Sequence, residues 1–151
     1  MLKFILCQGI SGSGKTTWAR HWTEEDPIHR IRLNYDDIRC MLGKYWVPER
    51  EDFVRYLFKH GLRYAMLNGY EIVIDNMNNL NPKHIKEYQD MIENFNRECT
   101  FEYTLKLKLF NTSLDECIRR DSLREHPIGE EVIKQQWEKY KDYIVNKSKE
   151  L

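Results

Sequence analysis

Residues 9–17 read GISGSGKTT and match the pattern G-x-x-x-x-G-K-[ST]. The apolar run at residues 2–7 precedes them, as expected of a strand buried on both faces, and a helix is predicted from about Lys15 to before Pro27. Three of the chain's seven glycines lie here, where side chains would keep backbone N–H groups from converging on phosphate oxygens. Strand, loop and helix together predict a P-loop that binds nucleotide phosphates; the alternative is a plain glycine turn.

The P-loop predicts ATP and a magnesium ion as ligands. Lys15 is expected to reach the β- and γ-phosphates, and the Thr16 hydroxyl to ligate Mg²⁺. Asp75 ends a predicted strand and has the position of a Walker-B-type acid, which would meet the metal directly or through water, although its apolar lead is short. The ATP-binding residues predicted in the loop are Gly9, Ser11, Gly12, Ser13, Gly14, Lys15, Thr16 and Thr17.

The rest of the chain alternates between predicted strands and predicted helices. Strands are expected at residues 29–33, 71–75 and 100–110, and helices at residues 36–42, 49–68, from Asn81 onward, 114–124 and 130–145. The apolar stripe of the long helix is predicted at Phe53, Leu57, Tyr64 and Leu67, and the last strand alternates through Phe101, Tyr103, Leu105, Leu107 and Leu109. This order favours an α/β fold, with a parallel β-sheet of four to five strands and helices on both faces.

Length and composition limit what else the chain contains. Its 151 residues, 41% of them hydrophobic, suffice for one core, so residues 1–151 are expected to form a single domain. The 24 basic side chains balance 24 acidic ones, which argues against a protein that coats long nucleic acids, while a local basic pocket stays compatible. The four cysteines lack metal-ligand spacing, and no stretch reaches the roughly 20 apolar residues that span a bilayer. A soluble, cytoplasmic protein with no membrane partner is expected.

Residues 34–39, NYDDIR, supply candidates for the phosphate acceptor. They follow the second predicted strand, at the edge where an open parallel sheet binds its ligands. Asp36 and Arg39 lie about one helical turn apart. Phosphoryl transfer to a hydroxyl uses a carboxylate to deprotonate the nucleophile and a guanidinium to hold a neighbouring anion. The spacing equally allows Asp36 or Asp37 to act only as the cap of the short helix.

A second arginine cluster occurs in RRDSLR at residues 119–124. Arg120 and Arg124 are four residues apart and share one face of the predicted helix. In a P-loop kinase such arginines close over the donor and neutralise the charge that develops on the transferred phosphoryl group. A solvated helix end, whose cations favour the C-terminal dipole, explains the same pattern.

Several segments resemble the kinase domain of the phage-type 5'-hydroxyl polynucleotide kinase family. The matching segments are GISGSGKTTWAR, NYDDIR, VPERED, VIDNMNNLNP and RRDSLR followed by a Pro-Ile pair and a helix, and they cover nearly the whole chain in order. The resemblance implies a P-loop kinase fold, with ATP as donor and Mg²⁺ as cofactor. It also implies that Asp36, rather than Asp37, is the general base and that Arg39 grips the phosphate beside the acceptor hydroxyl. Under the same resemblance, Arg120 and Arg124 cover the donor.

Departures from that family bear on the acceptor. Tyr35 stands before the acid pair where the family usually carries a basic residue, so its ring is expected to stack on a base or sugar of the acceptor. The Asp75 segment is one residue longer than the family pattern before Leu80, which leaves the register of Asn76 and Asn78 open. No phosphatase segment accompanies the kinase segments, so a separate phosphatase or ligase is an expected partner in end repair.

Four aromatic residues near these segments are interpreted from their spacing. Trp18 and Trp22, four apart on the first helix, are expected to pack in the core. Tyr45 and Trp46 lie in a loop-like stretch close to the acceptor residues, where a structural role and base stacking both stay open. The five histidines share no motif and are assigned no chemistry.

The function expected from the resemblance is ATP- and Mg²⁺-dependent transfer of a phosphoryl group to the 5'-hydroxyl of a DNA or RNA end, with Asp36 as base. One alternative is a P-loop kinase for another hydroxyl, carried by a modified DNA base, a sugar nucleotide as in zeta-toxin-like enzymes, or a small metabolite. Another is a nucleotide-binding switch without phosphotransfer. DNA against RNA, single against double strands, and the oligomeric state stay open.

Overall fold

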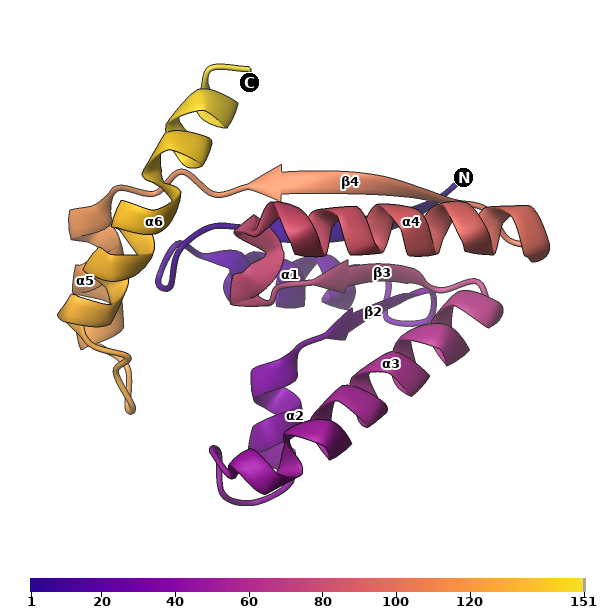
Figure 1. The fold of residues 1–151 in the computed structure, drawn as a ribbon, viewed down its shortest axis with the longest axis horizontal. Helices are drawn as coiled ribbons and strands as arrows, with labels where there is room; N and C mark the ends of the chain where they lie inside the picture. Colours follow the sequence, from indigo (N-terminus) through magenta and orange to yellow (C-terminus); the bar gives the residue numbers. More distant parts are fainter. Residues whose placement is uncertain (151) are drawn as a thin grey trace.

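The computed structural model describes residues 1–150, which form a four-stranded sheet whose paired strands are all parallel. The strands are ordered β2-β3-β1-β4, so β1 lies between β3 and β4 (Figure 1). Their bounds are β1 Leu2–Gln8, β2 Arg30–Leu33, β3 Glu71–Ile74 and β4 Tyr103–Leu109. The predicted α/β fold with a parallel sheet is confirmed.

Six α-helices accompany the sheet in the described part of the chain. Their bounds are α1 Lys15–Glu24, α2 Tyr35–Met41, α3 Glu51–Leu67, α4 Pro82–Glu98, α5 Leu114–Ser122 and α6 Glu130–Ser148. The 3-10 turns Pro48–Arg50 and Met77–Leu80 precede α3 and α4. Within residues 1–150, no helix is both long enough and apolar enough to cross a membrane.

The core occupies both faces of the sheet because side chains alternate along β1. Phe4 and Leu6 pack against α3 and α4, whereas Ile5 and Cys7 pack against α1. All four side chains are buried. The prediction that this strand is buried on both faces, with helices covering each, is therefore confirmed (Figure 1).

Short polar side chains set the starts of three helices. Asn81 and Ser113 each accept a hydrogen bond from a backbone N–H of the first turn, as their positions predicted. Asn34 caps α2 by accepting from the backbone N–H of Asp37 at 3.0 Å. Because this cap directly follows β2, α2 begins at the carboxyl edge of the sheet.

The apolar stripe predicted for α3 is wrong. Phe53 and Tyr64 are half or more exposed, while the helix buries Val54, Phe58 and Leu62 against the sheet. Both sets have helical spacing, so periodicity alone did not distinguish them. The helix presents its largest rings to solvent on the side opposite the core.

The predicted burial along β4 is confirmed only in part. The strand begins at Tyr103 rather than at residue 100, and Tyr103 is buried with its hydroxyl donating to the carbonyl of Tyr70 at 2.6 Å. Phe101 and Leu107 are about two-fifths exposed. Because β4 is an edge strand, neighbouring elements cover its side chains incompletely.

The last two helices pack beside the carboxyl edge of the sheet. Ile10 of the loop after β1 lies in one apolar cluster with Cys117 of α5 and with Ile133 and Ile144 of α6. The predicted helix at residues 114–124 ends at Ser122, so Arg124 lies in the turn that follows. This packing brings the α5–α6 turn next to residues 9–17.

Candidate active site

The loop between β1 and α1 depends on two glycines. Gly12 and Gly14 have φ angles of +82° and +102°, which L side chains rarely adopt. A Cβ atom on Gly12 would lie 2.5 Å from the backbone oxygen of Cys117 in α5. Both the backbone conformation and the close packing on α5 therefore require glycine at position 12.

Polar contacts hold the loop in place. Gln136 of α6 accepts from the backbone N–H of Ser11 at 2.9 Å and donates to the Ser11 hydroxyl at 3.0 Å. The Thr112 hydroxyl donates to the carbonyl of Ser13 at 2.8 Å. The Ser13 hydroxyl itself is buried and has no hydrogen-bond partner within residues 1–150. A fixed loop with a free donor fits the oxygens of a phosphate group.

The ammonium group of Lys15 folds back over the loop. Its Nζ donates to the carbonyl of Gly9 at 2.5 Å and to that of Ile10 at 3.0 Å. Burial lowers the pKa of Lys15 from its ordinary value to about 8, because desolvation disfavours the charged form. An anionic ligand in the loop would favour the charged form again.

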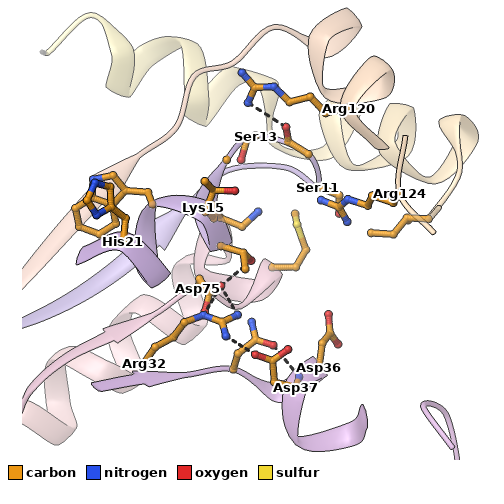
Figure 2. Close-up of a pocket in the computed structure, with 18 residues that line it drawn as sticks. Ser11, Ser13, Lys15, His21, Arg32, Asp36, Asp37, Asp75, Arg120 and Arg124 are labelled. Carbon is orange, nitrogen blue, oxygen red and sulfur yellow. Dashed lines mark hydrogen bonds and ion pairs between the residues drawn. The ribbon is translucent and has the colours of Figure 1, made fainter. Parts of the chain in front are cut away.

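A cavity of about 880 Å³ opens in front of the loop, between α1, α2 and the α5–α6 turn (Figure 2). Its size suits a nucleotide-sized ligand. The structure brings most of the predicted site to this cavity, while Gly9, Tyr35 and Arg39 do not line it. The predicted residues that line it are Ser11, Gly12, Ser13, Gly14, Lys15, Thr16, Thr17, Asp36, Asp75, Arg120 and Arg124.

The two predicted metal-binding residues meet at the back of the cavity. The Thr16 hydroxyl donates to Oδ2 of Asp75 at 2.7 Å, and Oδ1 of Asp75 is buried with no partner within residues 1–150. A hydroxyl and a carboxylate oxygen are donors that Mg²⁺ prefers, so these residues fit the ion. No group of three or more His, Cys, Asp or Glu side chains in residues 1–150 could hold a metal. Nucleotide phosphates would therefore complete its coordination.

Arg32 of β2 is a cavity residue that the sequence analysis missed. Its Nη2 and Nε atoms donate to Oδ2 of Asp75 at 2.7 and 3.0 Å, and Nη1 contacts Asp37. The guanidinium therefore joins the candidate metal-binding acid to the first turn of α2. The sequence offered one indication of this role: Arg32 is a cation within a short strand, two residues before the NYDDIR segment.

The two acids of α2 have different surroundings. Asn34 caps the helix, so the hypothesis that Asp36 or Asp37 serves as the cap is wrong. Asp37 is engaged by Arg32. Asp36 points toward the cavity and accepts on Oδ1 from Arg39 at 2.7 Å and from the Tyr45 hydroxyl at 2.9 Å. Since Oδ2 of Asp36 accepts no hydrogen bond within residues 1–150, it is the oxygen available to a ligand.

Tyr45 donates a hydrogen bond to Asp36, a contact that was not predicted from the sequence. Burial and the neighbouring Asp36 carboxylate raise the pKa of the Tyr45 hydroxyl to about 12. The phenol stays protonated near neutral pH and keeps donating to Asp36. Trp46 contacts Arg39 instead, with the guanidinium carbon 5.6 Å from its ring centroid.

Arg39 lies outside the main cavity, behind Asp36. Glu51, the first residue of α3, accepts from Arg39 Nε at 3.1 Å and from Nη2 at 2.7 Å, in a two-pronged ion pair. These hydrogen bonds raise the pKa of Arg39 and lower that of Glu51. Each terminal nitrogen keeps one N–H beyond these contacts. Glu51 lies within the quoted segment VPERED, but no role was predicted for it.

Tyr35 does not lie where the acceptor-stacking prediction needs it. Its ring stacks on Phe58 of α3 with centroids 4.2 Å apart, in the core beside β2. Its backbone N–H donates to the side chain of Asn76 at 2.9 Å. This contact sets the register of Asn76, which joins the end of β3 to the start of α2.

The two arginines of the lid hypothesis reach the opposite side of the cavity. Arg120 donates to Glu116 at 3.0 Å and to the Gly12 carbonyl at 3.4 Å. Arg124 lies 3.8 Å from Asp121, whose carboxylate also accepts the backbone N–H of Gly129 at 2.9 Å. Figure 2 shows both guanidinium groups beside the P-loop. The carboxylate of Glu116 thus accepts hydrogen bonds from both Arg119 and Arg120.

The helix after the P-loop adds two side chains to the cavity wall. Trp22 is buried as predicted and stacks on Trp18, with ring centroids 6.2 Å apart. Trp18 also lines the cavity, as does His21, to which no chemistry was assigned. The prediction of core packing is therefore confirmed for Trp22. Trp18 packs on Trp22 and also faces the cavity.

Known proteins share this fold. L-seryl-tRNA(Sec) kinase from Methanococcus maripaludis is 29% identical over 140 residues, which cover 90% of this chain and 51% of that protein. The structure of the Pnkp1/Rnl/Hen1 RNA repair complex contains a similar chain, with a TM-score of 0.75, 21% identity, and coverage of 97% of this chain and 46% of that one. A second Pnkp1/Rnl/Hen1 complex gives a TM-score of 0.61, 22% identity, and coverage of 85% and 40%. The chain spans about half the length of these relatives, or less.

The sequence also matches a family model. The model is described as an AAA domain and covers residues 4–145, from the first strand to the last helix. These bounds include the P-loop, both acids of α2, Asp75, Arg120 of α5 and Arg124 of the turn that follows. Together with the P-loop kinase fold, this match shows that the chain belongs to the family of P-loop kinase domains described as AAA domain.

Proposed function

We propose that this P-loop kinase domain transfers the γ-phosphoryl group of ATP to the 5'-hydroxyl of a polynucleotide. The observation that carries the proposal is the position of Asp36. Its free Oδ2 borders the cavity that Lys15 also lines, and its Oδ1 is held by Arg39 and Tyr45. A base and an anion-binding cation side by side fit a hydroxyl with a phosphate beside it.

On the donor side, the P-loop would hold the triphosphate. Lys15 would release its two backbone carbonyls and bind the β- and γ-phosphates, while the free Ser13 hydroxyl and the loop N–H groups bind further oxygens. Thr16 and Asp75 would hold Mg²⁺, which when bound neutralises charge on the phosphates. Arg120 and Arg124 would balance the charge that develops on the transferred group.

On the acceptor side, Asp36 Oδ2 would take the proton of the 5'-hydroxyl. The hydroxyl oxygen then forms a bond to the γ-phosphorus as the bond to the bridging oxygen of ADP breaks. Tyr45 and Arg39 would orient the carboxylate through Oδ1. The remaining N–H groups of Arg39 would bind the phosphodiester that follows the first nucleoside.

Two of the similar proteins have names that refer to RNA, which supports an RNA acceptor. The similar chain in the Pnkp1/Rnl/Hen1 RNA repair complex supports a role in RNA repair, for which we propose a separate phosphatase or ligase as partner. The 29% identity with L-seryl-tRNA(Sec) kinase favours a second candidate, in which the accepting hydroxyl belongs to an aminoacyl group on a tRNA. The two differ in whether a nucleic-acid 5' end is the acceptor.

An acceptor panel separates these candidates. Purified protein with Mg²⁺ and labelled ATP is offered a 5'-OH oligonucleotide, a nucleoside 3'-monophosphate, a free nucleoside and seryl-tRNA. We expect the oligonucleotide to be phosphorylated fastest, the 3'-monophosphate to be a workable acceptor and the nucleoside a poor one, because it lacks the anion for Arg39. Faster labelling of seryl-tRNA or of the plain nucleoside would overturn the proposal.

A further inference from the structure

The outer face of α3 carries aromatic rings in a row. Phe53, Tyr56 and Tyr64 are 50%, 56% and 67% exposed, although rings of this size gain much from burial. The Tyr56 and His60 rings lie 4.0 Å apart, and the Phe53 and Tyr56 rings 6.5 Å apart with 22° between their planes. We call Phe53, Tyr56, His60 and Tyr64 the aromatic row. It takes no part in the core or in the cavity described above.

A line of cations flanks the aromatic row. Arg55, Lys59 and Arg63 are spaced four residues apart and are exposed. Arg55 pairs with Asp52, and no Asp or Glu occurs from residue 53 to residue 70. Other surface lysines, such as Lys86 with Asp90, pair with an acid one turn away. Within residues 1–150, no carboxylate lies within 4 Å of Lys59 or Arg63. This face is therefore locally basic on a chain whose net charge is zero.

The aromatic row starts next to the acceptor side of the site. Glu51, which opens α3, holds Arg39, and Arg39 contacts Asp36. From Phe53 to Tyr64 the row extends about 16 Å at the helical rise of 1.5 Å per residue. About five stacked nucleotides cover this length at 3.4 Å each. Figure 1 shows α3 leading away from α2 toward the start of β3.

We propose that the outer face of α3 binds the nucleotides that follow the 5' end of a single-stranded acceptor. This inference rests on the proposed function. Aromatic rings stack on bases whatever their sequence, and cations beside them bind the backbone phosphates. A single strand can stack its bases on the aromatic row while its phosphates contact the cation line. A duplex cannot, because the faces of its bases are stacked inside the helix. Lys59 and Arg63, which have no carboxylate within 4 Å in residues 1–150, favour this polyanion over a protein partner.

The dependence of activity on acceptor length tests the proposal. The specificity constant kcat/KM is measured for a nucleoside 3'-monophosphate and for 5'-OH single strands of 2, 3, 6 and 12 nucleotides. We expect it to rise up to about six nucleotides and then level off, given the length of the row. Replacing Tyr56→Ser and Tyr64→Ser together should reduce the gain from 3'-monophosphate to 12-mer about tenfold.

The salt dependence of binding tests the cation line separately from transfer. The dissociation constant of a fluorescent 5'-phosphorylated 12-mer, which cannot accept a phosphoryl group, is measured between 50 and 200 mM salt. Replacing Lys59→Ser and Arg63→Ser should lower the slope of log Kd against log salt by about 1.4, at ~0.7 per phosphate contact on a single strand. The matched control Lys3→Ser with Arg97→Ser removes equal charge from exposed positions of β1 and α4 and should leave the slope unchanged.

Three results would overturn the inference. They are a length dependence that ends at two nucleotides, a 12-mer duplex bound as tightly as the single strand, and α3 variants that bind the 12-mer like wild type at every salt concentration. Melting temperatures of all variants check the fold, and these exposed side chains should leave them close to wild type. Since the binding assay needs no transfer, failure of the proposed kinase activity remains distinguishable from failure of the α3 surface.

Discussion

The donor half and the acceptor half of the site are built in different ways. On the donor side, nine consecutive residues form a loop and the first turn of α1. The backbone shape of the loop depends on glycine, and Gln136 and Thr112 fix its position. On the acceptor side, Asp36 and Arg39 lie on a seven-residue helix, bond each other, and are oriented by the side chains of Tyr45 and Glu51. The donor half is a backbone structure, whereas the acceptor half is a network of side chains.

This difference predicts different responses to mutation. A loop that binds phosphate through its backbone leaves few substitutions that preserve it, so changes there should abolish activity. A network of side chains can lose one member and keep the others, so changes there should be graded and should distinguish turnover from acceptor affinity.

The largest effect is expected for Lys15→Ala. Removing the cation at the β- and γ-phosphates should lower kcat by about 10³-fold or more, because charge on the transferred group is then left unbalanced. Steady-state kinetics measure the loss, and thermal unfolding checks that the fold survives. Lys83→Ala on the exposed start of α4 is the matched control and should keep wild-type rates. A Lys15→Ala variant with most of its turnover would contradict the donor assignment.

The next effect separates the two acids of α2. Asp36→Asn removes the proposed base and should lower kcat by about 10²- to 10⁴-fold with little change in ATP affinity. Asp37→Asn removes only the partner of Arg32 and should have a much smaller effect. Turnover and nucleotide binding are measured on both variants. The reverse order, with Asp37→Asn the more damaging change, would identify Asp37 as the base.

The lid arginines should act on turnover more than on nucleotide affinity. Replacing Arg120→Gln and Arg124→Gln together should lower kcat by about 10²-fold, since both groups meet charge that develops in the transition state. Arg119→Gln is the matched control, because Arg119 pairs with Glu116 without lining the cavity. Wild-type rates in the double variant would contradict the lid role and would favour the alternative, in which these arginines only end a solvated helix.

Glu51→Gln tests whether Glu51 positions Arg39 for the acceptor. It keeps the shape of the side chain but removes the charge that orients Arg39. We expect KM for the acceptor to rise about tenfold with a smaller change in kcat, as for loss of ground-state binding. Glu49→Gln, two residues earlier and exposed, is the control. Equal kinetics for both variants would show that Arg39 needs no positioning by Glu51.

The smallest effect is a dependence of nucleotide affinity on pH. With a pKa of about 8, Lys15 is charged below that pH and becomes neutral as the pH rises through it. Because the triphosphate binds the charged form, affinity should be constant up to about pH 8 and then fall by up to about tenfold per pH unit. Calorimetric titration of a non-hydrolysable ATP analogue measures this. Lys15→Arg stays charged, so any binding it retains should be flat over that range.

The sequence predicted the donor half well because that half is local. A strand, three glycines, a lysine and a threonine within nine residues carry their own geometry, and Asp75 follows from the order of the strands. The acceptor half depended on contacts across the fold. Glu51 lies 12 residues from Arg39, and Arg32 lies 43 residues from Asp75. Neither pairing has a spacing that a sequence pattern could reveal.

The errors have the same physical origin. Tyr35 was expected at the acceptor because it adjoins the acid pair, but the turn of α2 directs its ring onto Phe58 in the core. The stripe on α3 was predicted at Phe53, Leu57, Tyr64 and Leu67, but the helix buries Val54, Phe58 and Leu62 instead. In both cases the direction of a side chain was decided by the packing of α3 on the sheet rather than by periodicity.

The position of the transferred label distinguishes a 5'-hydroxyl acceptor from every other acceptor. A 5'-OH oligonucleotide is incubated with the protein, Mg²⁺ and γ-labelled ATP, and the product is digested to mononucleotides. The account predicts that all label is recovered as the 5'-phosphate of the first nucleotide, and that the Asp36→Asn variant transfers almost none. Label on a base substituent, on an internal hydroxyl or on no nucleotide at all would contradict it.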